Sequence, residues 1–251
     1  MDTIRYKFNV SYDGTHFAGF QIQPNGRTVQ GEIEKALKRM SKGQSVRLRS
    51  AGRTDAGVHA KGQVIHFDYP KFIPAASMQK GLNTLITNEI LLWDPEIVSK
   101  DFHAQYSATE KKYEYRVYNG KLRDPFIRNT TLHHPYEMNL EAVQIALKAI
   151  EGTHDFTSFS SAKTDKDNKV RTIYKAAVRI DSDTNEWIFT FSGDGFLYHM
   201  IRIIMGTLLE IADGRRKPEE MSEILAAKDR QAGGPTAAPN GLCLMSVSYD
   251  D

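Results

Sequence analysis

Residues 112–120 read KYEYRVYNG, and this stretch sets the pattern from which the fold is predicted. Its aromatic and apolar side chains alternate with charged ones, which is typical of a half-buried strand, and the final Asn-Gly pair is a turn signal. Residues 5–14, RYKFNVSYDG, repeat the order of basic residue, tyrosine, charged residue, aromatic, polar residue and valine before a turn with glycine. Two copies of one α+β unit would explain the repeat, and chance similarity over so short a stretch is the alternative.

Helix and strand patterns follow both segments. Apolar residues at helical spacing predict helices at 28–40, 77–86, 140–150, 196–211 and 218–226. Strands are predicted at 46–48, 63–67, 174–180, 186–192 and 243–249. Thr28 and Asn139 suit helix N-caps. The polar segment 163–169 is expected to be a mobile loop. We therefore predict an α+β fold with a mainly antiparallel sheet, in two halves of residues 1–105 and 106–251.

The composition is that of an ordinary globular protein. Of 251 residues, 40% are hydrophobic and 25% are charged. Cys243 is the only cysteine, which excludes an internal disulfide and a metal site built on several thiolates. No run of 18 apolar residues is present, so no membrane span is expected. The first residues lack the apolar core of a signal peptide, so the expected location is the cytoplasm.

Charge is distributed unevenly along the chain, although the net charge is only +2. Between residues 35 and 61 the sequence has eight cations and a single acid, Asp55. Their positions are Lys35, Lys38, Arg39, Lys42, Arg47, Arg49, Arg53 and Lys61. Such a cluster indicates a polyanionic partner, and a solvated helix face with a basic loop is the alternative.

Asp55 is the first candidate for chemistry. It lies between Gly52 and Gly57, which permit tight turns, and has Arg53 and His59 as neighbours in the sequence. Nearby cations keep a carboxylate ionised and available as a nucleophile. The alternative is a structural aspartate in a turn.

Arg202 lies in a segment, 196–211, that is apolar on nearly every face and is therefore expected to be buried. A buried guanidinium needs a carboxylate partner, because an unpaired buried charge is costly. The candidate partners are Asp55, Asp194 or another acid. In the alternative, the Arg202 side chain extends from the helix end to solvent.

Tyr113 follows two lysines, where a tyrosine can stack on a nucleobase or pack in a sheet. The eight histidines are scattered, and the adjacent pair at 133–134 has no third ligand at zinc-like spacing, so no metal is expected. The sequence contains no phosphate-binding loop, no dinucleotide-binding glycine motif after a strand and no recognisable hydrolase motif.

Residues 52–60, GRTDAGVHA, resemble the signature of the tRNA pseudouridine synthase I family, the TruA type. The match is long and contains rare choices, and it does not stand alone. Residues 12–21 resemble the first motif of the family, with Phe20 where tryptophan is commoner. Residues 102–115 resemble its central motif, with Gln105 where arginine is expected. Segments at 152–156, 196–202 and 238–242 resemble motifs of the second half in order, so the resemblance spans essentially the whole chain.

The resemblance implies two ferredoxin-like α+β halves sharing a mainly antiparallel sheet flanked by helices. It implies an isomerase that converts uridine to pseudouridine at positions 38–40 of the anticodon stem-loop of tRNA. It further implies a homodimer, an RNA partner and no association with a membrane. No cofactor is expected, because the reaction oxidises nothing and adds no group.

The resemblance also implies the site residues. Asp55 would be the nucleophile, attacking either the ribose C1′ or the uracil C6 of a flipped-out uridine. Arg202 would pair with Asp55, and Tyr113 would pack on the target base and is a candidate for the base that removes the C5 proton. Arg53 would fill the space that the flipped base leaves. Two other functions are weighed beside this one: a catalytically silent RNA-binding module, and a nucleoside hydrolase with the same carboxylate.

Overall fold

The computed structural model describes residues 3–162, 164 and 167–250. The chain divides into two compact units, Met1–Thr109 with Cys243–Asp251, and Glu110–Leu242. The predicted loop at 163–169 lies partly outside the described residues. The predicted division at residue 105 stays a prediction, because compactness alone does not show that either half folds independently.

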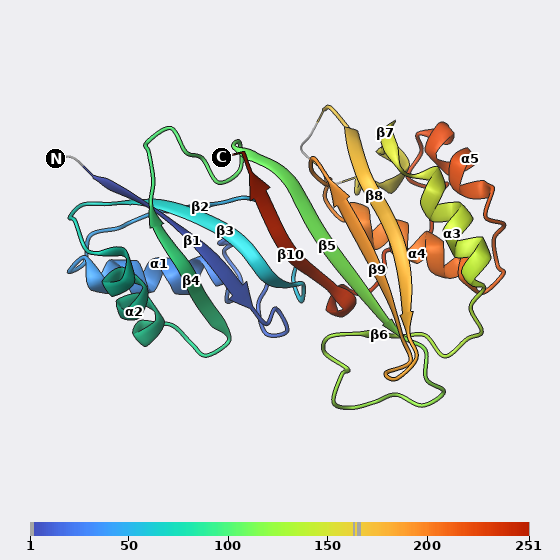
Figure 1. Ribbon diagram of the computed structural model, residues 1–251, viewed down its shortest axis with the longest axis horizontal. Helices are drawn as coiled ribbons and strands as arrows, with labels where there is room; N and C mark the ends of the chain where they lie inside the picture. The colour runs from blue at the N-terminus through green and yellow to red at the C-terminus, as the bar shows by residue number, and fades with distance from the viewer. Residues whose placement is uncertain (1–2, 163, 165–166, 251) are drawn as a thin grey trace. The chain divides into compact units, whose positions relative to one another are not determined.

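The first unit contains a sheet and two helices (Figure 1). Its central strands are β1 (Ile4–Tyr12) and β3 (His59–Tyr69), which pair antiparallel. Three further strands complete the sheet. The strand β4 (Ile90–Ile97) pairs antiparallel with β1, and β2 (Leu48–Ser50) pairs antiparallel with β3. The last strand, β10 (Leu242–Tyr249), pairs parallel with β3. The helices α1 (Val29–Met40) and α2 (Ala75–Leu85) contact each other.

The core of the first unit follows the alternation of β1. Tyr6, Phe8, Val10 and Tyr12 are buried, while the residues between them are half-buried, which confirms the predicted strand. The Phe67 ring on β3 stacks against Tyr6 at 5.7 Å and Phe8 at 5.8 Å between ring centroids. Aromatic pairs of this kind add to the stabilisation from burial alone.

The second unit has the strand order β5-β9-β8-β7, all antiparallel, formed by β5 (Ala108–Tyr118), β9 (Glu186–Gly193), β8 (Val170–Asp181) and β7 (Gly152–Asp155). The short β6 (Leu132–His133) pairs parallel to β5. The helix α3 (Leu140–Ala149) contacts both α4 (Met200–Ala212) and α5 (Glu220–Ala227) (Figure 1). The predicted α+β fold, with a mainly antiparallel sheet flanked by helices, is confirmed.

Most predicted elements are present, with shifted ends. Thr28 accepts a hydrogen bond from Gly31 N and Asn139 from Ala142 N, so both predicted N-caps are confirmed. The prediction that a helix begins at residue 196 is wrong by one turn. His199, the residue before α4, has φ of +64°, a left-handed conformation that cannot continue into an upstream right-handed helix.

No sequence pattern predicted β4, β6 or β7. The return of β10 to the first unit was equally unforeseen, since the chain must span the whole second unit before this strand pairs with β3. In the part of the chain that the structure describes, no helix has the length and apolar character needed to cross a membrane.

Candidate active site

Asp55 lies in a loop, residues 51–58, that joins β2 to β3 and is called the Asp55 loop below. Backbone hydrogen bonds fix both ends of this loop. Ala51 N donates to Val64 O at 2.8 Å, and Val58 N donates to Asp55 O at 3.1 Å. The second bond closes a four-residue turn whose third residue, Gly57, has φ of +78°. A positive φ at this position favours glycine, so Gly57 is required by the turn that Asp55 begins.

A second loop, residues 13–28, supports the Asp55 loop from outside. Phe20 N donates to Thr54 O at 3.1 Å, and Gly57 N donates to Phe17 O at 3.3 Å. The approach is close, because a Cβ added at Gly14 would lie 2.0 Å from Val58 O. Two of the family-like sequence segments therefore form one packed structure around Asp55.

Side chains fix the segment that precedes Asp55. The buried Thr54 hydroxyl is 2.7 Å from the Tyr12 hydroxyl. Burial raises the pKa of Tyr12, although hydrogen bonds with Thr54 and Gln63 oppose this shift, so Tyr12 is a neutral phenol. The Gln63 amide nitrogen donates to Gly52 O at 2.9 Å. The loop is therefore tied to both β1 and β3 by polar side chains.

His59, at the end of the same motif, is buried and lies at the start of β3. Its Nδ1 accepts a hydrogen bond from Gly14 N at 3.0 Å and is 3.2 Å from a carboxylate oxygen of Asp13. His59 is thus a positioning residue that holds the turn after β1 against the Asp55 loop.

The Asp55 residue itself is half-buried, whereas Arg53 is exposed to solvent. A half-buried carboxylate on a fixed loop can reach a bound molecule without rearrangement of the backbone. The turn at 55–58 is closed through the backbone of Asp55. Whether Asp55 is functional or only a turn residue stays a prediction.

Arg202 lies in the first turn of α4, where eleven of thirteen residues are buried, as predicted for this apolar helix. Arg202 is half-buried, and its Nε donates to the carbonyl of Ala237 at 2.8 Å. In return, Ala237 N donates to Arg202 O at 2.9 Å. The pairing of the guanidinium with a carboxylate stays a prediction.

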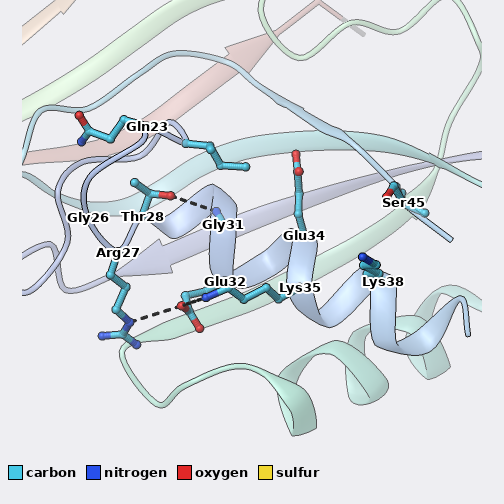
Figure 2. A pocket seen from close by; sticks show the side chains of 12 residues that line it. Gln23, Gly26, Arg27, Thr28, Gly31, Glu32, Glu34, Lys35, Lys38 and Ser45 are labelled. Carbon is cyan, nitrogen blue, oxygen red and sulfur yellow. Dashed lines mark hydrogen bonds and ion pairs between the residues drawn. The ribbon is translucent and has the colours of Figure 1, made fainter. Parts of the chain in front are cut away.

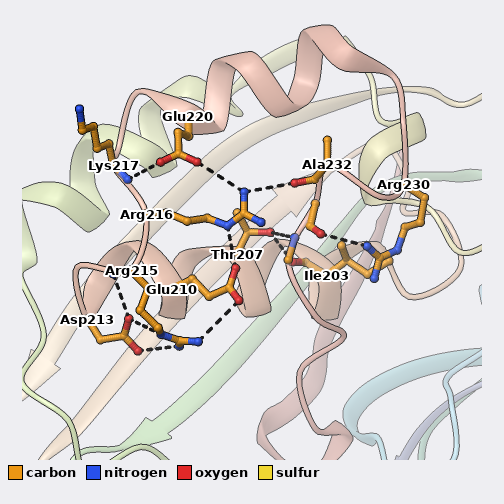
Figure 3. Close-up of polar contacts among 12 residues, drawn as sticks. Ile203, Thr207, Glu210, Asp213, Arg215, Arg216, Lys217, Glu220, Arg230 and Ala232 are labelled. Atoms are coloured by element: carbon orange, nitrogen blue, oxygen red, sulfur yellow. Dashed lines mark hydrogen bonds and ion pairs between the residues drawn. The ribbon is translucent and has the colours of Figure 1, made fainter.

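The segment that follows α5 is fastened along α4 by several polar contacts (Figure 3). Thr207 Oγ accepts a hydrogen bond from Gly234 N at 2.9 Å and donates to Ile203 O at 3.0 Å. Arg216, which lies between α4 and α5, links α4 to this segment: Glu210 binds its Nε at 2.8 Å, and its Nη1 donates to Ala232 O at 3.2 Å. Gly206 is required here, since an added Cβ would lie 1.8 Å from Pro235 O. These contacts hold the chain that carries Ala237, and with it the orientation of Arg202.

Tyr113 is a buried residue of β5, opposite Phe191 in the register with β9. Its ring packs edge-on against Phe196, with 5.3 Å between the centroids. The structure therefore gives Tyr113 a packing role in the sheet, and a contact with a base stays a prediction. Neither Phe196 nor Thr54, nor the Tyr12 hydroxyl, was assigned a role from the sequence, because each role depends on packing between distant segments.

Lys111 is a second residue near Tyr113 to which no role was given. Burial and the charge of Arg171 lower the pKa of this lysine, while Asp194 opposes the shift. A lysine with a lowered pKa loses its proton more readily than an exposed one. Lys111 lies on β5 opposite Gly193, two residues before Tyr113.

The eight lysine and arginine residues between positions 35 and 61 are all exposed. Lys35 and Lys38 line a cavity of about 330 Å³ along α1, where Glu32 and Glu34 lie beside them (Figure 2). Glu32 pairs with Lys35 at 3.1 Å and with Arg27 at 3.6 Å. This part of the basic run therefore has acidic partners, and binding of a polyanion by the run stays a prediction.

The described residues contain no group of three or more histidine, cysteine, aspartate or glutamate side chains that could hold a metal ion. Asp55 lies on a fixed loop of the first unit, and Arg202 and Tyr113 lie on α4 and β5 of the second. That these residues form one site stays a prediction.

Comparisons with known proteins agree with the motifs in the sequence. A family model described as tRNA pseudouridine synthase matches residues 9–107 and 146–250. The tRNA pseudouridine synthase A of Geobacillus sp. (strain WCH70) is 51% identical over 247 residues, covering 98% of this chain and 99% of the relative. The protein of the same name from Lacticaseibacillus casei (strain BL23) is 52% identical, covering 97% of this chain and 99% of the relative.

Among solved structures, a chain of a crystal structure of a Cbf5-Nop10-Gar1 complex is similar over 97% of this chain and 50% of its own length. The identity is 12% and the TM-score is 0.37, so this similarity adds no argument.

Proposed function

Because the chain belongs to the tRNA pseudouridine synthase family, we propose that it isomerises uridine to pseudouridine at positions 38–40 of the anticodon stem-loop of tRNA. The tRNA pseudouridine synthase activity is what the relatives share by name, and the three positions are the finer part of the proposal. We include in it a homodimer that acts on tRNA in the cytoplasm.

The observation that carries the proposal is the geometry of Asp55. Its loop is held by Tyr12, Gln63 and the 13–28 loop, while the aspartate itself is half-buried. A nucleophile must be held close to its productive position before the substrate binds, because loss of positional freedom is a large part of the barrier. We assign Asp55 as the nucleophile on this basis.

Three other residues complete the proposed site. Arg202 is assigned to pair with Asp55, keeping the carboxylate anionic and oriented; its Nε contact with Ala237 would hold the guanidinium in place. Tyr113 is assigned to pack on the target base, supported by Phe196. Arg53, which is exposed, is assigned to fill the space that the flipped base leaves in the stem.

The reaction is balanced without a cofactor. The target nucleotide first leaves the base stack, at a cost of about a few kcal/mol. Asp55 attacks either C1′ of the ribose or C6 of the uracil, and the N1–C1′ bond breaks. The uracil turns and C5 bonds to C1′. If Asp55 attacked C1′, this step displaces its carboxylate; if it attacked C6, the bond from C6 to the carboxylate oxygen breaks when the C5 proton leaves. N1 gains a proton, the C5 proton is released, and Asp55 is regenerated as a carboxylate. Tyr113 is a candidate for the group that removes the C5 proton.

Release of tritium from tRNA labelled at uridine C5 tests the proposal. The wild-type protein is expected to release tritium, and Asp55→Asn is expected to abolish release while leaving tRNA affinity within about threefold, since it removes a charge without changing the shape of the loop. Release by purified Asp55→Asn protein would refute the nucleophile assignment. Free uracil with abasic RNA would indicate a hydrolase, and tRNA binding without release by the wild type would indicate a silent RNA-binding module. Mapping pseudouridine in the treated tRNA tests the three positions.

A further inference from the structure

The most exposed stacked aromatic pair outside the proposed site lies between β4 and β5. The Tyr106 side chain is 79% exposed, yet its ring lies nearly parallel to the His103 ring, with 4.3 Å between centroids and 25° between planes. Single exposed aromatic side chains are common on protein surfaces. A ring that is held flat and still open to solvent is a different arrangement, because it presents a fixed aromatic surface.

Hydrogen bonds within residues 102–107 fix this stack. His103 Nδ1 accepts from Gln105 N at 3.2 Å and from Tyr106 N at 3.3 Å. The Ser107 hydroxyl accepts from His103 N at 3.0 Å, and Ser107 N donates to His103 O at 2.9 Å. The turn is therefore closed on both sides of the rings, and little conformational freedom remains to be lost when a ligand binds.

The base of the turn is anchored to β3. Ala104 N donates to His66 Nδ1 at 3.1 Å, and the His66 ring packs edge-on against His103 at 4.8 Å between centroids. Ala104 belongs to a buried cluster with Val64 and Ala51, the first residue of the Asp55 loop. The exposed stack and the Asp55 loop are thus built on the same core of the first unit.

Two arginines, Arg49 and Arg5, act electrostatically on the His103 ring, and Arg5 is paired with Asp68 at 2.9 Å. Arg49, which is exposed on β2, lies opposite His66 in the register. Burial, and then the charges of Arg49 and Arg5, lower the pKa of His103, which keeps its ring neutral near pH 7. A neutral imidazole under a phenol, beside an arginine, offers an aromatic face and a phosphate-binding group together. This combination is the one that proteins use to bind single-stranded RNA.

We propose that Tyr106, stacked on His103, binds one unpaired nucleobase of the substrate RNA, with Arg49 contacting a neighbouring phosphate. This inference rests on the proposed function for the identity of the RNA, and it adds a binding site separate from that of the target uridine. The occupant is a nucleobase because the exposed ring is held flat on an imidazole and the exposed Arg49 acts on that imidazole, whereas a protein partner for a lone aromatic side chain needs an apolar surface around it.

Equilibrium binding of unmodified tRNA to the full-length chain tests this site. Base–aromatic stacking contributes about 1–3 kcal/mol, so Tyr106→Ala is expected to raise the Kd about tenfold. Tyr106→Phe keeps the aromatic face and is expected to bind within about twofold of the wild type. Phe72→Ala removes another exposed aromatic side chain of the same unit, which is 66% exposed, and serves as the matched control with an unchanged Kd.

The salt dependence separates stacking from charge. Arg49→Gln is expected to reduce the slope of log Kd against log salt by about one, because one phosphate contact is lost, while Tyr106→Ala leaves this slope unchanged. Melting temperatures of all variants identify any that fail to fold. A tyrosine contact with phosphate or ribose would instead make Tyr106→Phe as weak as Tyr106→Ala, and would overturn the stacking assignment.

Two further outcomes would overturn the proposal. One is wild-type affinity for tRNA in folded Tyr106→Ala protein. The other is a change in sedimentation of that variant with no change in the Kd for tRNA, which would assign Tyr106 to contact with a second copy of the chain. Failure of the proposed function is distinguishable, because it appears as an absence of tritium release by the wild type, whatever the binding of the Tyr106 variants.

Discussion

Strands β1 and β5 have the same sequence pattern, but the residues after their last buried valine support different parts of the molecule. After Val10, the Tyr12 hydroxyl binds Thr54 beside Asp55. After Val117, the Asn119 amide donates to the carbonyls of His134 and Tyr136 at 2.6 and 2.8 Å. The shared pattern therefore determines which side chains of the strand are buried, while the two or three residues that follow determine which loop the strand supports.

The largest expected difference between the two regions is in the effect of replacing the glycines that end the turns after β1 and β5. A Cβ at Gly14 would lie 2.0 Å from the backbone carbonyl of Val58, whereas a Cβ at Gly120 would meet the half-buried Tyr118 side chain, which can rotate away. We expect Gly14→Ala to cost about 1–3 kcal/mol of stability. It should also lower tritium release about 100-fold by displacing the Asp55 loop, since small misplacements of a reacting group have effects of this size.

Gly120→Ala is the matched control, and it should cost about 0.5 kcal/mol, as for an ordinary surface substitution, with activity retained. Urea unfolding and the release assay measure both effects. Equal loss of activity in the two variants would show that the turns after β1 and β5 do not differ in the way described.

The strands that pair with β1 and β5 differ in their expected response to acid. His66 on β3 lies opposite Lys7 of β1, whereas Thr190 of β9 lies opposite Glu114 of β5. Burial, and then the charges of His103 and Arg5, lower the pKa of His66 to about 4. The folded state therefore favours neutral His66, and its stabilising contribution is complete above the unfolded value of about 6.5 and is lost as the pH falls towards 4.

This loss amounts to at most about 3 kcal/mol. His66→Gln keeps an acceptor for Ala104 N without a titrating group, so its urea midpoint should fall less than that of the wild type between pH 7 and pH 4.5. Burial also lowers the pKa of His134 in the second unit, so its contribution to stability is also lost as the pH falls. This loss is the same in the wild type and in His66→Gln, and it cancels when the two are compared. Parallel losses in wild type and His66→Gln would contradict the assignment.

The two buried phenols give the smallest expected effect. The hydroxyl of Tyr115 on β5 donates to Ala238 O at 2.7 Å, as that of Tyr12 on β1 bonds to Thr54. Tyr12→Phe removes the hydroxyl that bonds with Thr54 and Gln63, and Tyr115→Phe removes the partly buried bond to Ala238 O; each should cost about 1 kcal/mol. Thermal unfolding measures both losses. If Tyr12→Phe unfolds at the same temperature as the wild type, then Gln63 alone is sufficient to keep Thr54 and its neighbours in place.

Local sequence determined the parts of the fold that were predicted correctly. Thr28 and Asn139 cap their helices through residues only three positions away, so their roles can be inferred from the sequence. The start of α4 could not be inferred, because the left-handed His199 precedes an apolar run that continues the helical pattern in both directions. The parallel pairing of β10 with β3 joins segments far apart in the chain, and no periodicity reports it.

The candidate site shows the same division. The glycines of the Asp55 loop were recognised from the sequence because turns need them at fixed spacing. The hydrogen bonds from Tyr12 to Thr54 and from Gly14 to His59 join two loops, so their existence depends on packing. The burial of the helix that carries Arg202 was predicted correctly. The hydrogen bond from Arg202 Nε to the Ala237 carbonyl was not predicted, because residue 237 is separated from α4 in the chain by the whole of α5.

The pairing of β10 with β3 also bears on how the protein is made. Cys243 and Leu244 lie beside His59 and Ala60, directly after the Asp55 loop, and a Cβ at Gly62 would meet Met245 O at 2.4 Å. Residues 110–241 must therefore leave the ribosome before this strand can take its place. During translation the segment that carries Asp55 has an unpaired sheet edge for as long as the second unit takes to be synthesised, so the nascent first unit is the stage at which chaperone contact or misassembly is expected.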